Sequence, residues 1–254
     1  MKITWYGTAS LGIETKETKI LFDPFFPMKG SRVPSDINEF DGYKSIFITH
    51  GHLDHLACVP ELVRMNDAHV WCSETPSKTL AKKGLNESDV TVIYPGDTFQ
   101  IGDAYITVYR GKHIVRDVMI TKKTLFNTRV VRFVRNAMKM AKENIEYREN
   151  NETVGFFVES DGRSVFILGS LGLDYTEEYP QDVDLLVMPY QGASDLVTPA
   201  MNVIRTIRPN MVMLDHFDDT FPPVSSTIDT SDVEAVFAGR VPMVKPELGK
   251  EFIV

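Results

Sequence analysis

Cysteine is scarce in this sequence: there are two in 254 residues, Cys58 and Cys72, and neither belongs to a Cys-x-x-Cys pair. A disulfide framework is therefore excluded, and we expect both thiols to be small buried side chains. Apolar runs of the roughly 18 to 20 residues that span a bilayer are also absent. The first residues, MKITWYGTAS, lack the apolar stretch of a signal peptide. These absences predict a cytoplasmic protein with no membrane partner.

Basic charge is in deficit, with 27 Lys and Arg against 35 Asp and Glu and a net charge of -8. Because phosphate backbones are held mainly by Lys and Arg, we expect no nucleic-acid partner and favour a small-molecule substrate. One segment departs from this average: between Arg110 and Arg148 there are eleven basic and three acidic residues. The sequence thus carries a basic segment inside an acidic chain.

Short apolar, β-branched runs bounded by turn residues recur along the chain and predict strands. They cover residues 2–6, 18–22, 45–49, 70–73, 90–94, 104–109, 154–159, 164–168, 183–188 and 211–214. Asp161-Gly162 predicts a two-residue hairpin turn. Helical patterns lie at about 57–65, at about 129–147, and from Thr198 as N-cap to Pro209 as stop. We expect one α/β domain over 1–254, with sheet inside, helices outside and a basic helical insertion at about 115–150.

Four candidate metal ligands follow the buried strand at 45–49 within six residues, as His50-Gly51-His52-Leu53-Asp54-His55. In an extended segment residues i and i+2 face the same way, so His50 and His52 can bind one ion, and Gly51 permits a tight approach. As the chain turns toward a helix, Asp54 and His55 can reach a second ion. Imidazole and carboxylate suit Zn²⁺ and also Mn²⁺ or Fe²⁺.

This His-x-His-x-Asp-His pattern after a buried strand resembles the signature of the metallo-β-lactamase superfamily. The resemblance implies a four-layer αβ/βα sandwich and one or two divalent ions, with zinc favoured. It implies that His113 completes the first metal site and His216 the second, and that Asp23 supports the histidine loop from behind. Of the six histidines only His69 is left over, and we interpret it as an ordinary strand residue.

The sequence departs from the family where an aspartate usually bridges the two metals. The strand at 164–168 leads into Gly169-Ser170-Leu171-Gly172-Leu173-Asp174, which places Ser170 at that position. A neutral hydroxyl is a poor bridging ligand for such an ion. Three alternatives stay open: Asp174 reaches back, a hydroxide alone bridges, or the second site is weak or empty.

The basic segment has two interpretations. As a lid it would recognise an anionic substrate near the metal, with Lys112 and Arg116 as candidate substrate-binding residues. As an amphipathic helix it would pack by its apolar face and leave its charges solvated. Contact within a homo-oligomer is a further alternative.

The function that follows is metal-dependent hydrolysis. A metal ion lowers the pKa of bound water from about 15.7 to roughly 7, so hydroxide is available to attack, with Asp54 as the catalytic residue that orients it. The run Asp215-His216-Phe217-Asp218-Asp219-Thr220-Phe221-Pro222 resembles the branch of L-ascorbate-6-phosphate lactonases and implies a small anionic, phosphorylated lactone or ester as substrate. The alternatives are a phosphodiesterase of the same fold and a non-catalytic metal-binding or ligand-sensing module.

Overall fold

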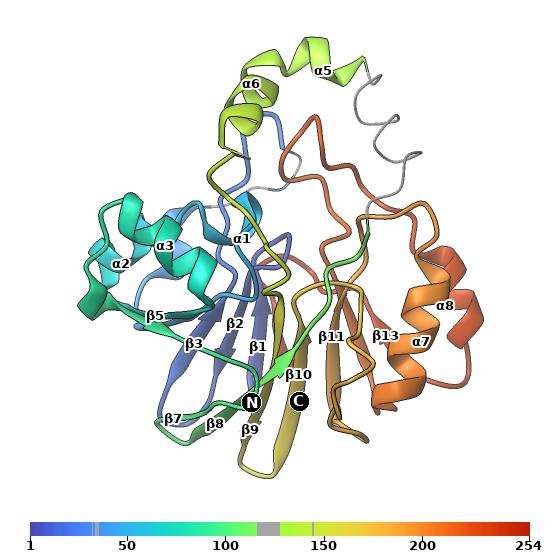
Figure 1. Ribbon diagram of the computed structural model, residues 1–254. Helices are drawn as coiled ribbons and strands as arrows, with labels where there is room; N and C mark the ends of the chain where they lie inside the picture. The colour runs from blue at the N-terminus through green and yellow to red at the C-terminus, as the bar shows by residue number, and fades with distance from the viewer. Residues whose placement is uncertain (32, 34–35, 116–127, 144) are drawn as a thin grey trace.

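The computed structural model describes residues 1–31, 33, 36–115, 128–143 and 145–254. Within these ranges the chain forms two seven-stranded sheets with helices on their outer faces (Figure 1). In spatial order the first sheet comprises β14 (Glu251–Ile253), β1 (Lys2–Trp5), β2 (Leu11–Glu14), β3 (Lys19–Phe22), β4 (Ser45–Phe47), β5 (His69–Cys72) and β6 (Val90–Val92). The second comprises β13 (Met243–Val244), β12 (Val212–Asp215), β11 (Leu185–Pro189), β10 (Arg163–Leu168), β9 (Val154–Ser160), β8 (Ala104–Arg110) and β7 (Thr98–Ile101).

The sheets pack against each other because their strands are apolar on both faces. In β11, Leu185 and Val187 lie in the core between the sheets, whereas Leu186 and Met188 lie in the core beneath the outer helices. Successive side chains of a strand point to opposite faces, so a continuous apolar run places a strand in the middle of a layered structure.

Helices cover both outer faces. The first sheet is covered by α1 (Leu53–Leu56), α2 (Val59–Asn66) and α3 (Glu74–Lys82), and the second by α7 (Val197–Ile207) and α8 (Ser231–Phe237). Two further helices, α5 (Arg129–Arg132) and α6 (Val134–Glu143), lie over one end of the sheets (Figure 1). Short 3₁₀ turns occupy Ile37–Phe40 and Glu87–Asp89. The predicted α/β sandwich with helices outside is confirmed.

All ten predicted strands are present, with ends shifted by up to two residues. The predicted turn is confirmed too, because Asp161 and Gly162 both have positive φ and join β9 to β10. The sequence missed β2, β7, β13 and β14, which have two to four residues each, and the helices α1, α3 and α8. Runs this short carry too little periodicity to stand out. None of the helices in the described ranges has the length and apolar character needed to cross a membrane.

Two predicted helices differ in detail. Helix α7 begins at Val197, so Thr198 is not its N-cap; the side chain of Asp195 accepts a hydrogen bond from the Thr198 amide at 3.1 Å and satisfies that donor instead. The helix predicted at 129–147 is two helices interrupted at Phe133, whose ring packs onto Gly30. A Cβ at Gly30 would lie 2.3 Å from that ring and would displace it, and the positive φ of 89° at Gly30 also favours glycine.

Candidate metal centre

Two groups of side chains that could hold a metal ion lie side by side at the ends of the strands. His50, His52 and His113 form the first group. Asp54, His55 and His216 form the second. Within each group the candidate donor atoms lie within 4.8 Å of one another. The structure thus brings together six side chains that span 167 positions of the sequence, and these are the six that the sequence analysis singled out.

The histidine loop is held from behind by Asp23, which follows β3 and is 1% exposed. Its Oδ1 accepts a hydrogen bond from the Thr49 amide at 2.8 Å, and its Oδ2 accepts one from the Thr49 hydroxyl at 2.6 Å. The same Oδ2 lies 2.9 Å from Nδ1 of His55, and the Thr49 hydroxyl lies 3.1 Å from Nδ1 of His50. Because both Nδ1 atoms are engaged on this side, the Nε2 atoms of His50 and His55 are left to face the site.

The first group consists of neutral imidazoles. Nε2 of His50 and Nδ1 of His52 are 3.1 Å apart, and the His113 ring centroid lies 5.0 Å from that of His50 and 4.7 Å from that of His52. Burial lowers the pKa of His50 well below its usual value and that of His52 to about 4, and the neighbouring imidazoles lower the pKa of His50 further. Burial also lowers the pKa of His113. Near pH 7 these rings therefore keep the lone pairs that a metal requires.

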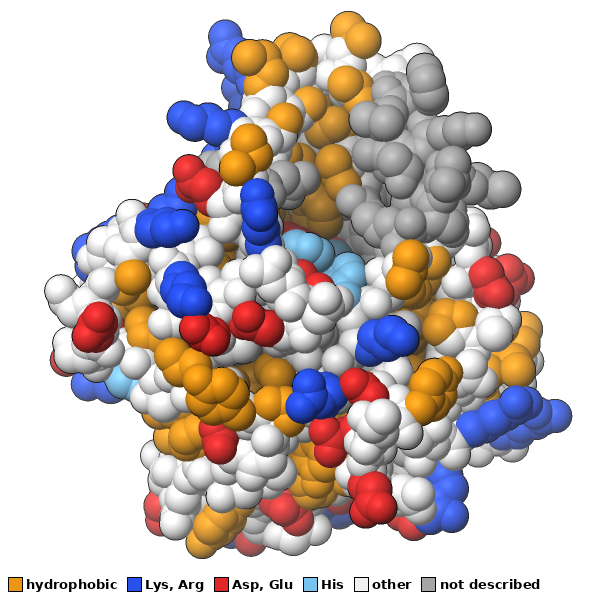
Figure 2. All heavy atoms as spheres, in the orientation of Figure 1, with side chains coloured by type: hydrophobic (Ala, Val, Ile, Leu, Met, Phe, Trp, Pro, Cys, Tyr) orange, Lys and Arg blue, Asp and Glu red, His pale blue; other side chains and the backbone are white. Residues whose placement is uncertain are grey.

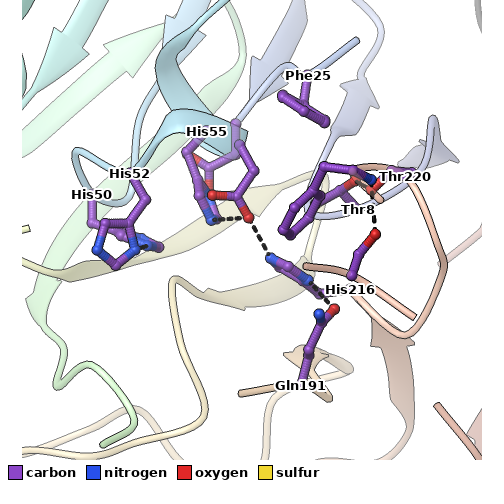
Figure 3. A network of polar contacts seen from close by, with 12 residues as sticks. Thr8, Phe25, His50, His52, His55, Gln191, His216 and Thr220 are labelled. Atoms are coloured by element: carbon purple, nitrogen blue, oxygen red, sulfur yellow. Dashed lines mark hydrogen bonds and ion pairs between the residues drawn. The ribbon is translucent and has the colours of Figure 1, made fainter. Parts of the chain in front are cut away.

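The second group is a hydrogen-bonded carboxylate and imidazole pair beside a further histidine. Oδ2 of Asp54 lies 3.0 Å from Nε2 of His216 and 3.7 Å from Nε2 of His55 (Figure 3). Burial lowers the pKa of His216, but the hydrogen bond and charge of Asp54 outweigh it and raise the pKa to about 9. Burial raises the pKa of Asp54. The charge of His55 and the hydrogen bond and charge of His216 outweigh this effect and leave the pKa well below its usual range. Without a metal, this group holds a proton at pH 7.

His216 is placed by contacts with distant parts of the chain. It directly follows β12, has a positive φ of 58°, and donates its amide to the Thr8 carbonyl at 2.8 Å. The side chain of Gln191 lies 2.9 Å from its Nδ1, which turns Nε2 toward Asp54 (Figure 3). Strained backbone of this kind in a non-glycine residue persists where the surrounding structure enforces it, and it is frequent at functional sites.

The two groups form the floor of a cavity of about 500 Å³. Figure 2 shows the histidines at the bottom of a hollow on the surface, with basic side chains near its edge. Apolar residues line other parts of the cavity: Leu53, Ile114, Met140, Pro189, Phe221 and Val224. Met140 belongs to α6 and is buried against the core, so this helix closes one side of the site.

Ser170 lies in this cavity, but its hydroxyl has a structural partner. Its Oγ accepts a hydrogen bond from the Ile114 amide at 3.0 Å, next to His113 in the chain. Asp174 lies elsewhere: its Oδ1 accepts hydrogen bonds from the amide and hydroxyl of Thr176, and it lines no part of the cavity. The structure thus brings Ser170 to the site and does not bring Asp174 there.

The two candidate substrate-binding residues of the sequence analysis have different outcomes. Lys112 is exposed and is not among the described residues that line the cavity. Arg116 lies outside the described residues, as do Lys122 and Lys123. The cavity is lined instead by Tyr147, Arg148, Glu149 and Asn150, which follow α6.

The remaining predictions concern residues outside the site. His69 lies in β5, and its Nε2 lies 2.7 Å from the Thr91 hydroxyl, so it is a hydrogen-bonded strand residue as predicted. Cys58 and Cys72 are both buried free thiols, as expected.

The sequence analysis missed the residues that orient the ligands, chiefly Thr49, Gln191 and Thr8. Thr49 could have been noticed, because it is the last residue before the histidine motif. Gln191 and Thr8 carry no local signal, since only the folded chain brings them to His216.

Comparison with known proteins agrees with this architecture. The chain is 33% identical to a UPF0173 protein of Pyrococcus abyssi over 113 residues, which is 44% of this chain and 50% of the relative. It is 33% identical to a UPF0173 metal-dependent hydrolase of Rhizobium etli over 114 residues, 44% of this chain and 48% of the relative. The chain therefore spans about half the length of the curated relatives it matches.

A solved structure extends the similarity over the whole chain. Igni18, a metallo hydrolase of the archaeon Ignicoccus hospitalis, superposes with a TM-score of 0.67 at 18% identity, covering 100% of this chain and 98% of that one. At this identity the likeness concerns the fold. A family model described as a beta-lactamase superfamily domain matches residues 2–215. On that match, together with the two-sheet sandwich and the histidine loop at its strand ends, the chain belongs to the beta-lactamase superfamily.

Proposed function

We propose that this chain is a metal-dependent hydrolase that acts on a small molecule. The observation that carries the proposal is the pair of donor groups, three histidines beside two histidines and an aspartate, on the floor of one cavity. Three histidines are the protein ligands of a well-known type of catalytic zinc site, and two histidines with a carboxylate suit iron, manganese or zinc.

The residues present fit such ions. Two ligand nitrogens in a tetrahedral zinc site with bonds of about 2.0 to 2.1 Å lie about 3.3 Å apart, close to the 3.1 Å between Nε2 of His50 and Nδ1 of His52. The rings of His50, His55 and His216 are each oriented through Nδ1, an arrangement typical of metal-ligating histidines. We propose His50, His52 and His113 as ligands of a first ion, and Asp54, His55 and His216 as ligands of a second.

When bound, a divalent ion supplies acidification of water and polarisation of the oxygen under attack. The chain's own residues prepare the site for this chemistry. Asp54 presents an ionised carboxylate between His55 and His216 of the second group, where it can orient a water molecule. The apolar lining from Met140, Phe221 and Val224 limits access of bulk water and strengthens electrostatic interactions in the cavity.

As substrate we propose a small anionic ester or lactone, including the phosphorylated lactones implied by the resemblance of residues 215–222 to the L-ascorbate-6-phosphate lactonase branch. A cavity of about 500 Å³ suits a small molecule. Zinc is the ion we favour, because the three-histidine group is a zinc set. The same proposal includes one domain over 1–254 with the insertion at about 115–150 beside the site, a cytoplasmic location and no nucleic-acid partner. The net charge of -8 supports the last point. Homo-oligomer contact stays a prediction.

Ser170 favours a second candidate, a non-catalytic metal-binding or ligand-sensing module. The hydroxyl supplies no bridging charge and is engaged by the Ile114 amide, so the second ion depends on Asp54, His55 and His216 alone. A module of this kind would bind metal at the first group and turn nothing over.

The test compares metal content with turnover in the same preparation. We would load the protein with zinc, manganese or iron, measure bound metal by elemental analysis, and assay panels of lactones, carboxylic esters and phosphodiesters. We expect lactone or ester turnover that is lost in His52→Ala and unaffected in His69→Ala, a matched histidine outside the site. Stoichiometric metal without turnover would favour the sensing module, and turnover restricted to phosphodiesters would favour the phosphodiesterase.

A further inference from the structure

Arg148 is the one lysine or arginine among the described residues that line the cavity. The other lining residues include five histidines and the acidic side chains of Asp54 and Glu149. Arg148, an exposed residue, is therefore the basic side chain that the described lining offers to a ligand, and the proposed hydrolysis does not use it.

The backbone of Arg148 is packed directly onto the histidine loop. A Cβ added at Gly51, between His50 and His52, would lie 2.1 Å from the Arg148 carbonyl oxygen. The preceding residue, Tyr147, is buried in the core beside α2 and α3. The backbone of Arg148 thus has a defined position beside the histidine loop, although it lies at the far end of the insertion in the sequence.

Among the described residues, the guanidinium of Arg148 has a hydrogen-bond acceptor but no carboxylate partner. Its Nε donates to the Ile145 carbonyl at 3.0 Å, and within the described ranges no carboxylate lies within ion-pair distance of it. The neighbouring Glu149 is engaged elsewhere, because its carboxylate accepts hydrogen bonds from the amide and hydroxyl of Thr153 and from the Asn151 amide. By contrast, Arg129 of α5 is paired with Asp219 at 2.6 Å. Within the described part of the chain, no side chain engages the terminal nitrogens of Arg148.

We propose that Arg148 determines substrate specificity: its guanidinium binds the phosphate of a phosphorylated ester or lactone whose scissile bond lies over the two donor groups. Arginine offers a planar pair of donors that matches phosphate oxygens. This inference rests on the proposed hydrolase activity, and it adds a candidate substrate contact at the other end of the basic segment from Lys112 and Arg116.

Two lactones that differ only in phosphate provide the test, 6-phosphogluconolactone and gluconolactone. In Arg148→Gln we expect KM for the phosphorylated lactone to rise about tenfold, the lower range for a hydrogen bond to a charged group that is partly exposed. We expect KM for gluconolactone to stay unchanged and Arg148→Lys to recover part of the loss. The matched control is Arg240→Gln, an exposed arginine that does not line the cavity. An equal change for both lactones, or no change for either, would overturn the assignment.

A binding measurement separates this inference from the proposed activity. Calorimetric titration of the metal-free protein with inorganic phosphate needs no turnover, and we expect about tenfold weaker binding in Arg148→Gln than in wild type or Arg240→Gln. If wild type hydrolyses neither lactone but this difference is seen, the hydrolase proposal fails on these substrates and the phosphate contact stands. If phosphate binds equally to all three proteins, the role of Arg148 is refuted.

Discussion

Removing the carboxylate of Asp23 tests whether the histidine loop depends on support from behind. Asp23 lies in contact with three polar atoms in the interior: the Thr49 amide, the Thr49 hydroxyl and Nδ1 of His55. The two Thr49 donors would each be left without a hydrogen bond, at a cost of about 1 to 3 kcal/mol each, and Nδ1 of His55 would lose its ion-pair contact. We therefore expect Asp23→Ala to lower the free energy of unfolding of the metal-free protein by roughly 2 to 6 kcal/mol.

Two further variants show how much the charge of Asp23 and its contact with the Thr49 hydroxyl each contribute to this loss of stability. Asp23 has a positive φ of 43°, which asparagine tolerates better than alanine, so Asp23→Asn keeps the backbone and one acceptor while removing the charge. Thr49→Val removes only the hydroxyl contact, and we expect a loss of about 1 to 2 kcal/mol. The expected order of stability is wild type, Thr49→Val, Asp23→Asn, Asp23→Ala.

The assay is urea unfolding of the metal-free proteins, combined with competition for metal against a chelator. Residues that orient metal ligands change affinity by about 10- to 100-fold when replaced. We expect a loss in that range for Asp23→Asn. A loss of stability below about 1 kcal/mol in Asp23→Ala, with unchanged metal affinity, would refute the role of Asp23.

Three further predictions concern the same site. Gly51→Ala should displace the histidine loop or the segment at Arg148, because its Cβ would lie 2.1 Å from a carbonyl oxygen. We expect clear losses of stability and metal affinity; Gly51 has no positive φ, so these losses are steric, whereas Gly84→Ala, which has a φ of 90° and an added Cβ that meets no atom within 4 Å, should lower stability by backbone strain alone and leave metal affinity unchanged. Ser170→Ala removes the acceptor of the Ile114 amide and should weaken metal binding at the first group by about tenfold, whereas Ser170→Thr should retain most of it; equal affinity in Ser170→Ala would contradict the positioning role. The two groups should also differ in pH dependence. In the metal-free protein the His216 pKa of about 9 lies above its unfolded value of 6.5, so its pairing with Asp54 stabilises the fold fully below pH 6.5 and loses that contribution as the pH rises through 9. A metal at the second group must displace this proton, so the metal affinity of that group should rise about tenfold per pH unit between pH 7 and 9. The metal affinity of the first group, in which the His52 pKa is about 4, should change little with pH. Chelator competition in Asp54→Asn reports on the first group and in His113→Ala on the second, and parallel pH profiles in these two variants would contradict the expectation.

The sequence by itself determined the layered α/β class, the ten principal strands and the six candidate ligands. Strands buried on both faces are apolar throughout, and a local run such as His50 to His55 brings four donors together without help from the rest of the chain. His113 and His216 could be assigned only through a family resemblance, because they lie far from the loop in the sequence and local geometry therefore says nothing about where they lie.

Tertiary structure alone decided which atoms orient those ligands and what surrounds them. Gln191 and Thr8 reach His216 from other loops. The Ser170 hydroxyl accepts a hydrogen bond from the Ile114 amide, and Asp174 accepts one from Thr176. The same holds for Arg148, whose proximity to Gly51 joins positions almost a hundred residues apart. Such contacts depend on how loops from different strands meet at one edge of the sandwich, and hydrophobic periodicity carries no information about that meeting.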